Sequence, residues 1–253
     1  RPVLLNNWEA THCDFDEDRL KQLFDGARQV GAELFLLDDG WFGNGPYSRD
    51  DDKHGLGDWD PSTKKLPKGL SYIAKEALKR KVGFGIWLEP EMVNPQSELY
   101  QKHPDWIITQ SKREPILGRH QEILDLTRPE VQAFEWDIID KTLRPNPDIT
   151  YVKWDCNRYI TQPGSSYLQP ADQSHLWIDY NRALYRLMDR FAKGFPNVMA
   201  MLCAGGSGRV DYGAMPYFHS FWPSDNTDPL GRIKIQWGFS HFFPACLLYT
   251  SDA

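Results

Sequence analysis

Acidic side chains follow nearly every short apolar run in this sequence, and several have a tryptophan close by. A single Asp after a strand ordinarily caps the next helix, and Asp228, which directly precedes Pro229, suits that role. Capping does not explain two acids in tandem or the tryptophans beside them. Carboxylates that accept from hydroxyl groups, next to aromatic faces that cover apolar C–H surfaces, are what a polyol ligand needs. The acids that we single out are Asp38, Asp39, Asp155 and Asp225.

The segment around Asp155 is the strongest candidate for catalysis. Side chains alternate between the two faces of a strand, so Lys153 and Asp155 should point the same way, with Asn157 just beyond the strand and Trp154 packed on the opposite face. Lys153 and Asp155 could form a structural ion pair. Alternatively, the Lys153 ammonium keeps Asp155 ionised and donates to a substrate hydroxyl. An ionised carboxylate in a dry pocket is a competent nucleophile.

Short apolar runs alternate with longer amphipathic stretches along the chain. This order predicts a parallel sheet with helical crossovers, and seven such units favour a (β/α)8 TIM barrel over an open sheet. No glycine-rich dinucleotide-binding motif follows the first run, which also disfavours the open sheet. The predicted strands are 3–8, 34–37, 82–88, 123–126, 151–154, 198–202 and 218–222, and the predicted helices are 20–30, 70–78, a segment that begins near Pro129, 176–191 and 233–243.

The predicted barrel is incomplete at its carboxyl end. Residues 1–246 form the expected catalytic barrel, which stops before an eighth strand, and residues 247–253 are predicted to be an unmatched tail. The active sites of such barrels lie at the carboxyl ends of the strands, so the acids named above should meet at one mouth. A barrel without its last strand leaves two strand edges uncovered, which is a liability for folding.

Composition narrows the class of partner. The chain has 253 residues with 29 Lys and Arg against 35 Asp and Glu, a formal net charge of −6 that argues against a nucleic-acid partner. No apolar run is long enough for a membrane span. The four cysteines form no CxxC pair, so we expect a reducing, cytoplasmic compartment. The histidines are scattered, and Glu89 and Glu91 suit a structural salt bridge as well as a ligand role, so we expect neither a metal nor a cofactor.

Six motifs, in order, give the chain a resemblance to the α-galactosidases of glycoside hydrolase family 36 and, more loosely, to the wider melibiase clan. They extend from Trp8 to about Gly238. The resemblance implies a retaining α-galactosidase that acts on small oligosaccharides of the melibiose or raffinose type. The motifs are Asn7-Trp8-Glu9-Ala10, Leu37-Asp38-Asp39-Gly40-Trp41-Phe42, Trp87-Leu88-Glu89-Pro90-Glu91-Met92-Val93, Lys153-Trp154-Asp155-Cys156-Asn157-Arg158, Cys203-Ala204-Gly205-Gly206-Ser207-Gly208-Arg209 and Trp222-Pro223-Ser224-Asp225-Asn226-Thr227-Asp228.

The resemblance also implies a role for each residue of the site. Asp155 matches the family's nucleophile and Asp225 matches its general acid/base. Asp38 and Asp39 match the pair that holds O4 and O6 of galactose, the sugar that differs from glucose in its axial O4. The remaining substrate-binding residues implied are Trp8 and Trp222 as aromatic walls, Lys153 and Arg119 as hydrogen-bonding groups, Asn157 beside the nucleophile, and Cys203, Gly205 and Gly206 as the narrow loop near O2.

The implied mechanism is a double displacement in which two carboxyls lie about 5–5.5 Å apart. Asp225 starts protonated beside Trp222, while Asp155 starts ionised beside Lys153. Full-length members of the family also carry β-domains on both sides of the barrel. These domains are not in this sequence, and the resemblance implies that the full-length form is a homo-oligomer.

Several alternatives remain open. An α-galactosyl transglycosylase, similar to raffinose or stachyose synthases, would use the same two Asp residues. An α-N-acetylgalactosaminidase would use the same scaffold, although Cys203 favours a galactosidase. A non-catalytic sugar-binding fragment would need neither Asp155 nor Asp225. A phosphate-binding barrel built on Gly205-Gly206-Ser207-Gly208 is disfavoured, because these glycines follow the sixth predicted strand and the acids would repel a phosphate.

Overall fold

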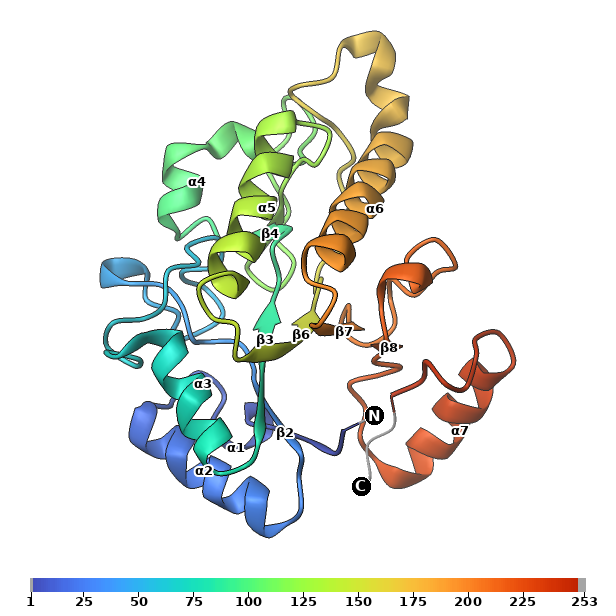
Figure 1. Cartoon of the computed structure of the whole chain (residues 1–253). Coiled ribbons are helices and arrows are strands. Elements are labelled where there is room, and N and C mark those ends of the chain that lie inside the picture. Colours follow the sequence, from blue (N-terminus) through green and yellow to red (C-terminus); the bar gives the residue numbers. More distant parts are fainter. Residues whose placement is uncertain (1, 250–253) are drawn as a thin grey trace.

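A parallel sheet of six strands, curled into part of a barrel, forms the centre of the computed structural model, which describes residues 2–249 (Figure 1). Every neighbouring pair in this sheet is parallel, so helical crossovers must join the strands. The carboxyl ends of all six strands therefore lie at the same edge. The strands, in spatial order, are β1 (Leu4–Asn6), β2 (Leu34–Leu37), β3 (Gly83–Leu88), β6 (Ile149–Trp154), β7 (Met199–Leu202) and β8 (Ser220–Phe221).

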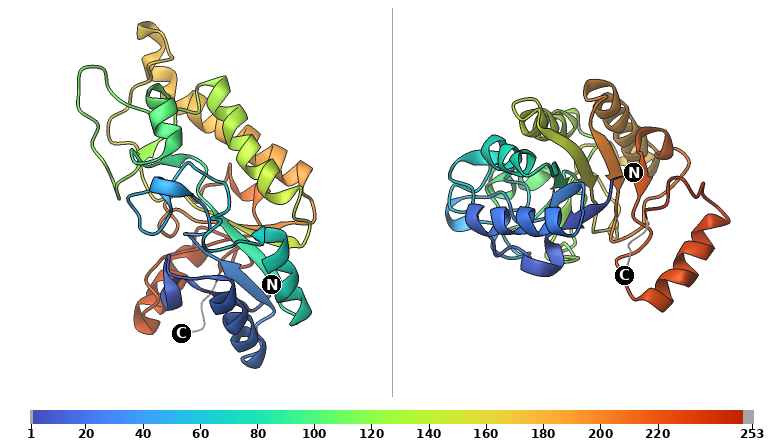
Figure 2. Two further views of the ribbon diagram at one scale, coloured as in Figure 1. Left: turned by 90° about the vertical axis from the view of Figure 1, so that its left-hand side faces the viewer. Right: turned by 60° about the horizontal axis from the view of Figure 1, so that its bottom comes forward.

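Helices cover the outer face of the sheet, as Figure 2 shows from two further directions. All four residues of β2 are buried, as expected of a strand with a helix layer on one side and the barrel interior on the other. Helix α5 links β3 to β6, and α6 links β6 to β7. The main helices are α2 (Glu17–Gln29), α3 (Gly69–Lys79), α5 (Pro129–Leu143), α6 (Leu176–Gly194) and α7 (Pro229–Ser240), with short helices α1 (Trp8–Thr11) and α4 (Glu98–Lys102) near the mouth.

Helix positions follow the predicted apolar stripes and caps. The stripe predicted on 176–191 is the buried face of α6. Asp16 caps α2, because its side chain accepts from the backbone N–H of Arg19 at 2.7 Å. Asp228 caps α7 through a 2.6 Å bond from the backbone N–H of Gly231, as its place before Pro229 predicts.

The predicted fourth strand, 123–126, is not part of this sheet. Instead β3 pairs directly with β6, and the segment contributes β5 (Glu122–Ile123), which pairs antiparallel with β4 (Met92–Val93). Residues between β3 and α5 make an excursion over the carboxyl end of the sheet, where the apolar side chains of Ile123, Leu124 and Leu126 are buried. An apolar run of four residues does not distinguish a barrel strand from a buried excursion. Asp155 therefore follows the fourth strand of the sheet and Asp225 the sixth.

The first predicted strand is also shorter than expected. Strand β1 ends at Asn6, whose side-chain oxygen accepts from the backbone N–H of Trp8 at 2.7 Å. This bond turns the chain, so Trp8 begins the one-turn helix α1 instead of completing the strand. Trp8 still reaches the mouth of the barrel.

The carboxyl-terminal part of the structure continues the curl of the sheet. Within the predicted tail, Leu248 forms a parallel bridge with Phe221 of β8, and the Tyr249 hydroxyl donates to the carbonyl of Pro2 at 3.2 Å. Residues 250–253 of that tail lie outside the described residues. Helix α7 stands apart in Figure 1, with Trp237 68% exposed. No helix among residues 2–249 is long and apolar enough to cross a membrane.

Candidate active site

A cavity of about 570 Å³ opens at the carboxyl ends of the strands. It gathers side chains that are distant in sequence, because several strands of the sheet end at this edge. Nine of the predicted site residues line it: Trp8, Asp38, Asp39, Arg119, Lys153, Asp155, Asn157, Trp222 and Asp225. The carboxyl ends of the strands thus supply both predicted catalytic acids to one space, as the barrel geometry requires.

Asp38 is held by side chains from two other strands, β1 and β6. Its Oδ2 accepts from Asn6 Nδ2 at 2.5 Å and from Lys153 Nζ at 2.8 Å, and its Oδ1 accepts from the backbone N–H of Asp39. The side chain is only 3% exposed, so these bonds fix one orientation of the carboxylate. A carboxylate offers about four acceptor positions, which leaves capacity for a ligand hydroxyl.

Asp39 is held by a different cation. Arg49, fully buried, donates from Nε to Asp39 Oδ1 at 2.9 Å and from Nη2 to Oδ2 at 2.6 Å. Arg49 is held in turn by Asn94 Oδ1 at 3.0 Å and by the carbonyl of His54 at 3.1 Å. This bidentate pair is the strong form of an Arg–carboxylate contact. Each of the two adjacent acids therefore has a cationic partner of its own.

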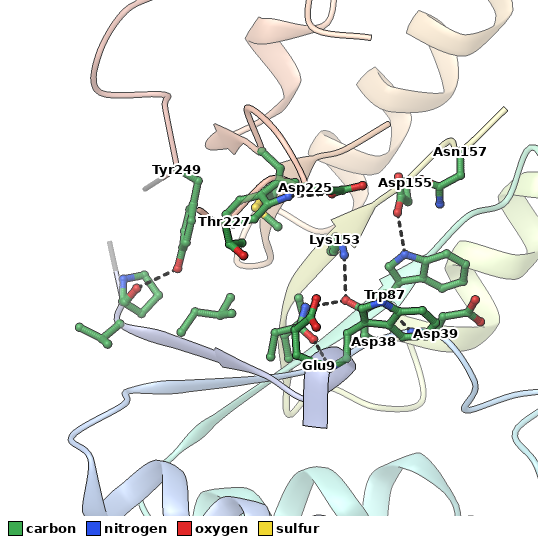
Figure 3. Close-up of a pocket in the computed structure, with 18 of the residues that line it drawn as sticks. Glu9, Asp38, Asp39, Trp87, Lys153, Asp155, Asn157, Asp225, Thr227 and Tyr249 are labelled. Atoms are coloured by element: carbon green, nitrogen blue, oxygen red, sulfur yellow. Dashed lines mark hydrogen bonds and ion pairs between the residues drawn. The ribbon is translucent and has the colours of Figure 1, made fainter. Parts of the chain in front are cut away.

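Lys153 forms its ion pair with Asp38 (Figure 3), so of the two alternatives for Lys153 the structural ion pair with Asp155 is not formed. Burial would lower the pKa of Lys153, but the negative groups around it, chiefly Asp38, hold that pKa well above its usual range. The lysine is therefore a permanent cation in the cavity. Trp154 points to the helix layer as predicted, with its ring 5.8 Å from that of Phe191.

Asp155 is buried and surrounded by donors. Trp87 Nε1 donates to its Oδ2 at 3.0 Å, and the backbone N–H of Cys156 donates to its Oδ1 at 2.8 Å. A longer bond of 3.4 Å comes from the backbone N–H of Gly205. Burial raises the pKa of Asp155, but the charge of Lys153 and the hydrogen bonds from its donors outweigh burial, so the pKa lies below its usual value. Asp155 is therefore ionised at neutral pH.

Asp225 has a more open setting on the loop after β8. Its side chain is exposed, and its Oδ1 accepts from Trp222 Nε1 at 2.9 Å. The Arg232 guanidinium covers the Trp222 ring at 4.6 Å from its centroid. Since Arg232 occupies one face of that ring, Trp222 is fixed as a hydrogen-bond donor to Asp225, and only its remaining surface is available as an aromatic wall.

The predicted O2 loop lies beside Asp155, the predicted nucleophile. Cys203, Gly205 and Gly206 are not among the described residues that line the cavity. Gly206 has a φ of +99°, and a Cβ there would lie 2.8 Å from Ser224 Cα. The glycine thus allows the loop after β7 to pack against the loop that carries Asp225. Arg119, also at a positive φ of 51°, is exposed at the mouth.

Four further residues belong to this arrangement but were not predicted as site residues. Trp87 and Asn6 contact Asp155 and Asp38 directly, and strand alternation at the ends of β3 and β1 could have indicated them. Glu89, two residues after Trp87, is fully buried near Asp155. Arg49 gave no signal, because it lies in an irregular loop. Glu91 forms the structural salt bridge, with Arg209 Nη1 at 2.7 Å. Among residues 2–249, no group of three or more His, Cys, Asp and Glu could hold a metal.

Comparison with known proteins agrees with this architecture. The α-galactosidase AgaA of Geobacillus stearothermophilus is 46% identical over 96% of this chain, and α-galactosidase 1 of Pediococcus pentosaceus is 43% identical over 98%. The crystal structure of AgaA, a glycoside hydrolase family 36 α-galactosidase, superposes with a TM-score of 0.93 over 98% of this chain and 34% of its own. Variants of AgaA have been solved with raffinose and with stachyose.

The matches cover almost all of this chain but a minor part of each relative. The chain spans 33% of the length of each of these two curated relatives. The family model described as Melibiase matches residues 1–250, which includes the segment beside β8. The resemblance seen in the six motifs is confirmed: the chain belongs to the melibiase family.

Proposed function

We propose that this site hydrolyses terminal α-galactosyl residues with retention of configuration. The observation that carries the proposal is the pairing, in one cavity, of a buried, ionised Asp155 with an accessible Asp225. A retaining glycosidase needs one carboxylate as nucleophile and a second carboxyl that exchanges protons with the leaving group and with water. The membership of the chain in a family whose similar members are named α-galactosidases supports this assignment.

The proposed reaction has two displacement steps. Asp155 attacks C1 of the galactosyl unit, the bond from C1 to the leaving oxygen breaks, and Asp225 gives its proton to that oxygen. The product is a β-galactosyl ester on Asp155. Asp225 then removes a proton from water, the water oxygen attacks C1, and galactose leaves with its α configuration while Asp155 is regenerated. The donors on Asp155, including Trp87 Nε1, keep it ionised for the first step.

Asp38 and Asp39 are proposed to select galactose. Both acids are held by hydrogen bonds from cationic side chains, and their remaining lone pairs can accept from O4 and O6. A sugar with an equatorial O4 would leave a buried acceptor unpaired, and such a mismatch discriminates strongly between substrates. Lys153, Arg119, Asn157 and Trp8 are proposed to hold the other ring substituents, since all four line the cavity.

We propose small α-galactosides of the raffinose type as substrates. The solved complexes of AgaA variants with raffinose and stachyose support this class. Galactosyl transfer and α-N-acetylgalactosaminidase activity are less well supported, because the similar proteins are named galactosidases. A non-catalytic fragment would not require the donors arranged around Asp155.

We further propose the barrel type, the assembly and the compartment of the whole protein. The six parallel strands belong to a (β/α)8 barrel, of which 1–246 is the catalytic part. The whole protein is a homo-oligomer. It acts in the cytoplasm, in keeping with the four cysteines, all unpaired in the described structure. Size-exclusion chromatography with light scattering and cell fractionation test the last two statements.

A substrate panel tests the proposed reaction. The purified protein should hydrolyse an aryl α-galactoside, and it should act far more slowly on the aryl α-glucoside and the aryl α-N-acetylgalactosaminide. Proton NMR of the first product formed should show α-galactose before mutarotation. Activity on the glucoside alone, or β-galactose as the first product, would overturn the substrate class or the retaining mechanism respectively.

A further inference from the structure

Glu89 is a buried acid that the proposed reaction does not use. It follows β3 directly and its side chain is fully buried. Its Oε1 accepts from the backbone N–H of Asn157, and its Oε2 lies 3.2 Å from Gln121 Nε2. Glu89 thus connects the excursion before β5 to the loop that carries Asp155.

The charges around Glu89 disfavour its ionised form. From the loop after β6 it faces Asp155 and Cys156, and from the loop after β2 it faces Asp39. Two cations act on it from a distance: Arg119, exposed at the mouth, and Arg49, which is committed to Asp39 by two hydrogen bonds.

Glu89 forms no ion pair in the part of the chain that the structure describes. Burial, and next the charge of Asp155, raise the pKa of Glu89 to about 8. Ionisation of two neighbouring carboxyl groups in a buried site is unfavourable because the two negative charges repel each other, so one carboxyl keeps its proton. Since Asp155 has the donors and Lys153 nearby, Glu89 is the one that stays neutral.

Gln121 supplies an acceptor for that proton. The Gln121 side chain is fully buried and its Oε1 has no hydrogen-bond partner in the described structure. The oxygen and nitrogen of a side-chain amide occupy equivalent positions after a half-turn. That half-turn places Oε1 at the position 3.2 Å from Glu89 Oε2. A protonated Glu89 then donates O–H to Gln121 Oε1 and still accepts from Asn157, while the Gln121 amide nitrogen takes the position in which Oε1 had no partner.

We propose that Glu89 is a neutral, proton-holding positioning residue, which clamps the loop after β6 through the Asn157 N–H and leaves Asp155 as the only anion of that pair. The inference rests on the proposed role of Asp155 as nucleophile. The proton sits on Glu89 Oε2 and remains there through both displacement steps. Glu89 acts on the reaction through the position of Asp155 and not by contact with the sugar.

Carbon-13 NMR of protein labelled at glutamate carboxyls tests the protonation state directly. At pH 6–7 the Glu89 resonance, assigned by its loss in Glu89→Gln, should have the shift of a protonated carboxyl and should titrate near pH 8. Glu135→Gln is the matched control, because Glu135 is also fully buried but lies on α5 with its own carboxyl oxygens unpartnered. It should remove a different resonance and leave the Glu89 resonance and the activity unchanged.

Measurements of kcat and Tm on Glu89 variants distinguish a neutral Glu89 that positions the loop from a Glu89 whose negative charge is required. Glu89→Gln keeps an acceptor for Asn157 and a donor for Gln121, so kcat at pH 6 should stay within about threefold of wild type. Glu89→Ala loses both bonds, and kcat should fall about tenfold or more. When the pKa of a carboxyl is higher in the folded than in the unfolded state, the free energy of unfolding falls as the pH rises toward the folded-state pKa. Glu89→Gln lacks this titration. The Tm of Glu89→Gln minus the Tm of wild type should therefore increase as the pH rises from 5 to about 8.

Two results would overturn the proposal. One is a Glu89 resonance that titrates together with the exposed glutamates. The other is a Glu89→Gln variant that folds but loses activity to the extent of Glu89→Ala, because that would mean that a charge is needed. The NMR result does not depend on the galactosidase assignment, which fails separately if Asp155→Asn retains full turnover.

Discussion

The two carboxyls that we propose to be catalytic lie in contrasting surroundings. Asp155 is 4% exposed and receives hydrogen bonds from Trp87, from the Cys156 backbone and from the Gly205 backbone. Asp225 is exposed, with Trp222 Nε1 donating to it at 2.9 Å. This difference matches the two tasks. A nucleophile must keep one charge and one position, whereas an acid/base must exchange protons with a leaving group and with water.

The cations near the two carboxyls also differ. We call the surroundings of Asp155 the nucleophile side and those of Asp225 the acid/base side. On the nucleophile side, Arg49 and Lys153 each pair with a buried carboxylate. On the acid/base side, Arg232 donates to the carbonyl of Ser224 at 2.8 Å and covers the Trp222 ring. Ion pairs therefore stabilise the nucleophile side. Ring packing and a hydrogen bond to a neutral carbonyl stabilise the acid/base side. Changes on the two sides should have different consequences.

The largest expected effect separates the two carboxyls by product. Asp155→Ala and Asp225→Ala should each lower kcat/KM for raffinose by about 10³-fold or more. With azide and an aryl α-galactoside, Asp155→Ala should give β-galactosyl azide, because azide replaces the nucleophile. Asp225→Ala should give α-galactosyl azide, because azide attacks the ester on Asp155. NMR of the products decides, and the same anomer from both variants would refute the assignment of two roles.

Removal of Arg49 should destabilise the fold more than removal of Arg232. Arg49→Ala leaves the buried Asp39 carboxylate unpaired, which typically costs about 3–5 kcal/mol in the free energy of unfolding. Arg232→Ala leaves no carboxylate unpaired, so its cost should be clearly smaller. Urea unfolding of both variants measures the difference. Equal losses would show that the nucleophile side is not held by charge as the geometry indicates.

Lys153→Met should move the acid limb of activity. Burial raises the pKa of Asp155 and Lys153 is the largest opposing influence, so without the lysine that pKa should rise. Because kcat/KM requires ionised Asp155, its acid limb should shift upward by about one pH unit. The pH profile of kcat/KM checks this, with Lys193→Met on an exposed helix pair as the control. An unmoved limb would exclude Lys153 as the group that keeps Asp155 ionised.

The smallest expected effect is at the loop between the two sides. Gly206→Ala places a Cβ 2.8 Å from Ser224 Cα at a φ of +99°, which should cost about 2 kcal/mol in stability and disturb the loop of Asp225. Gly205→Ala at a φ of +57° meets only Asn157 Oδ1 at 3.6 Å and should cost about 1 kcal/mol. Thermal unfolding and kcat of both variants provide the test. A more damaging Gly205→Ala would reverse the packing argument.

The sequence allowed prediction of what depends on local pattern. The stripe of α6, the cap at Asp228 and the strand 34–37 all follow from apolar spacing and from residue types with strong local preferences. The acids predicted at the strand ends line one cavity, because parallel strands bring those ends together whatever the count of strands.

The rest depended on tertiary context. The run 123–126 has three apolar residues and an Asp, like the other predicted strand ends, and only the direct pairing of β3 with β6 excludes it from the sheet. Lys153 lies two residues from Asp155 yet pairs with Asp38, 115 positions away, because that carboxylate lies closer in space. Arg49 carries no local signal, since its partner Asp39 is reached by a loop whose path the sequence does not reveal.

The bond between Tyr249 and Pro2 joins residues 247 positions apart. The ribosome releases the amino-terminal end first. The contact of Pro2 with Tyr249 can therefore form only after every later strand has been synthesised. Contacts between residues so far apart in sequence form late and slow folding. Until they form, the free edge of β1 can associate with other chains. Expression at low temperature or with chaperones that shield strand edges should therefore raise the yield of folded protein.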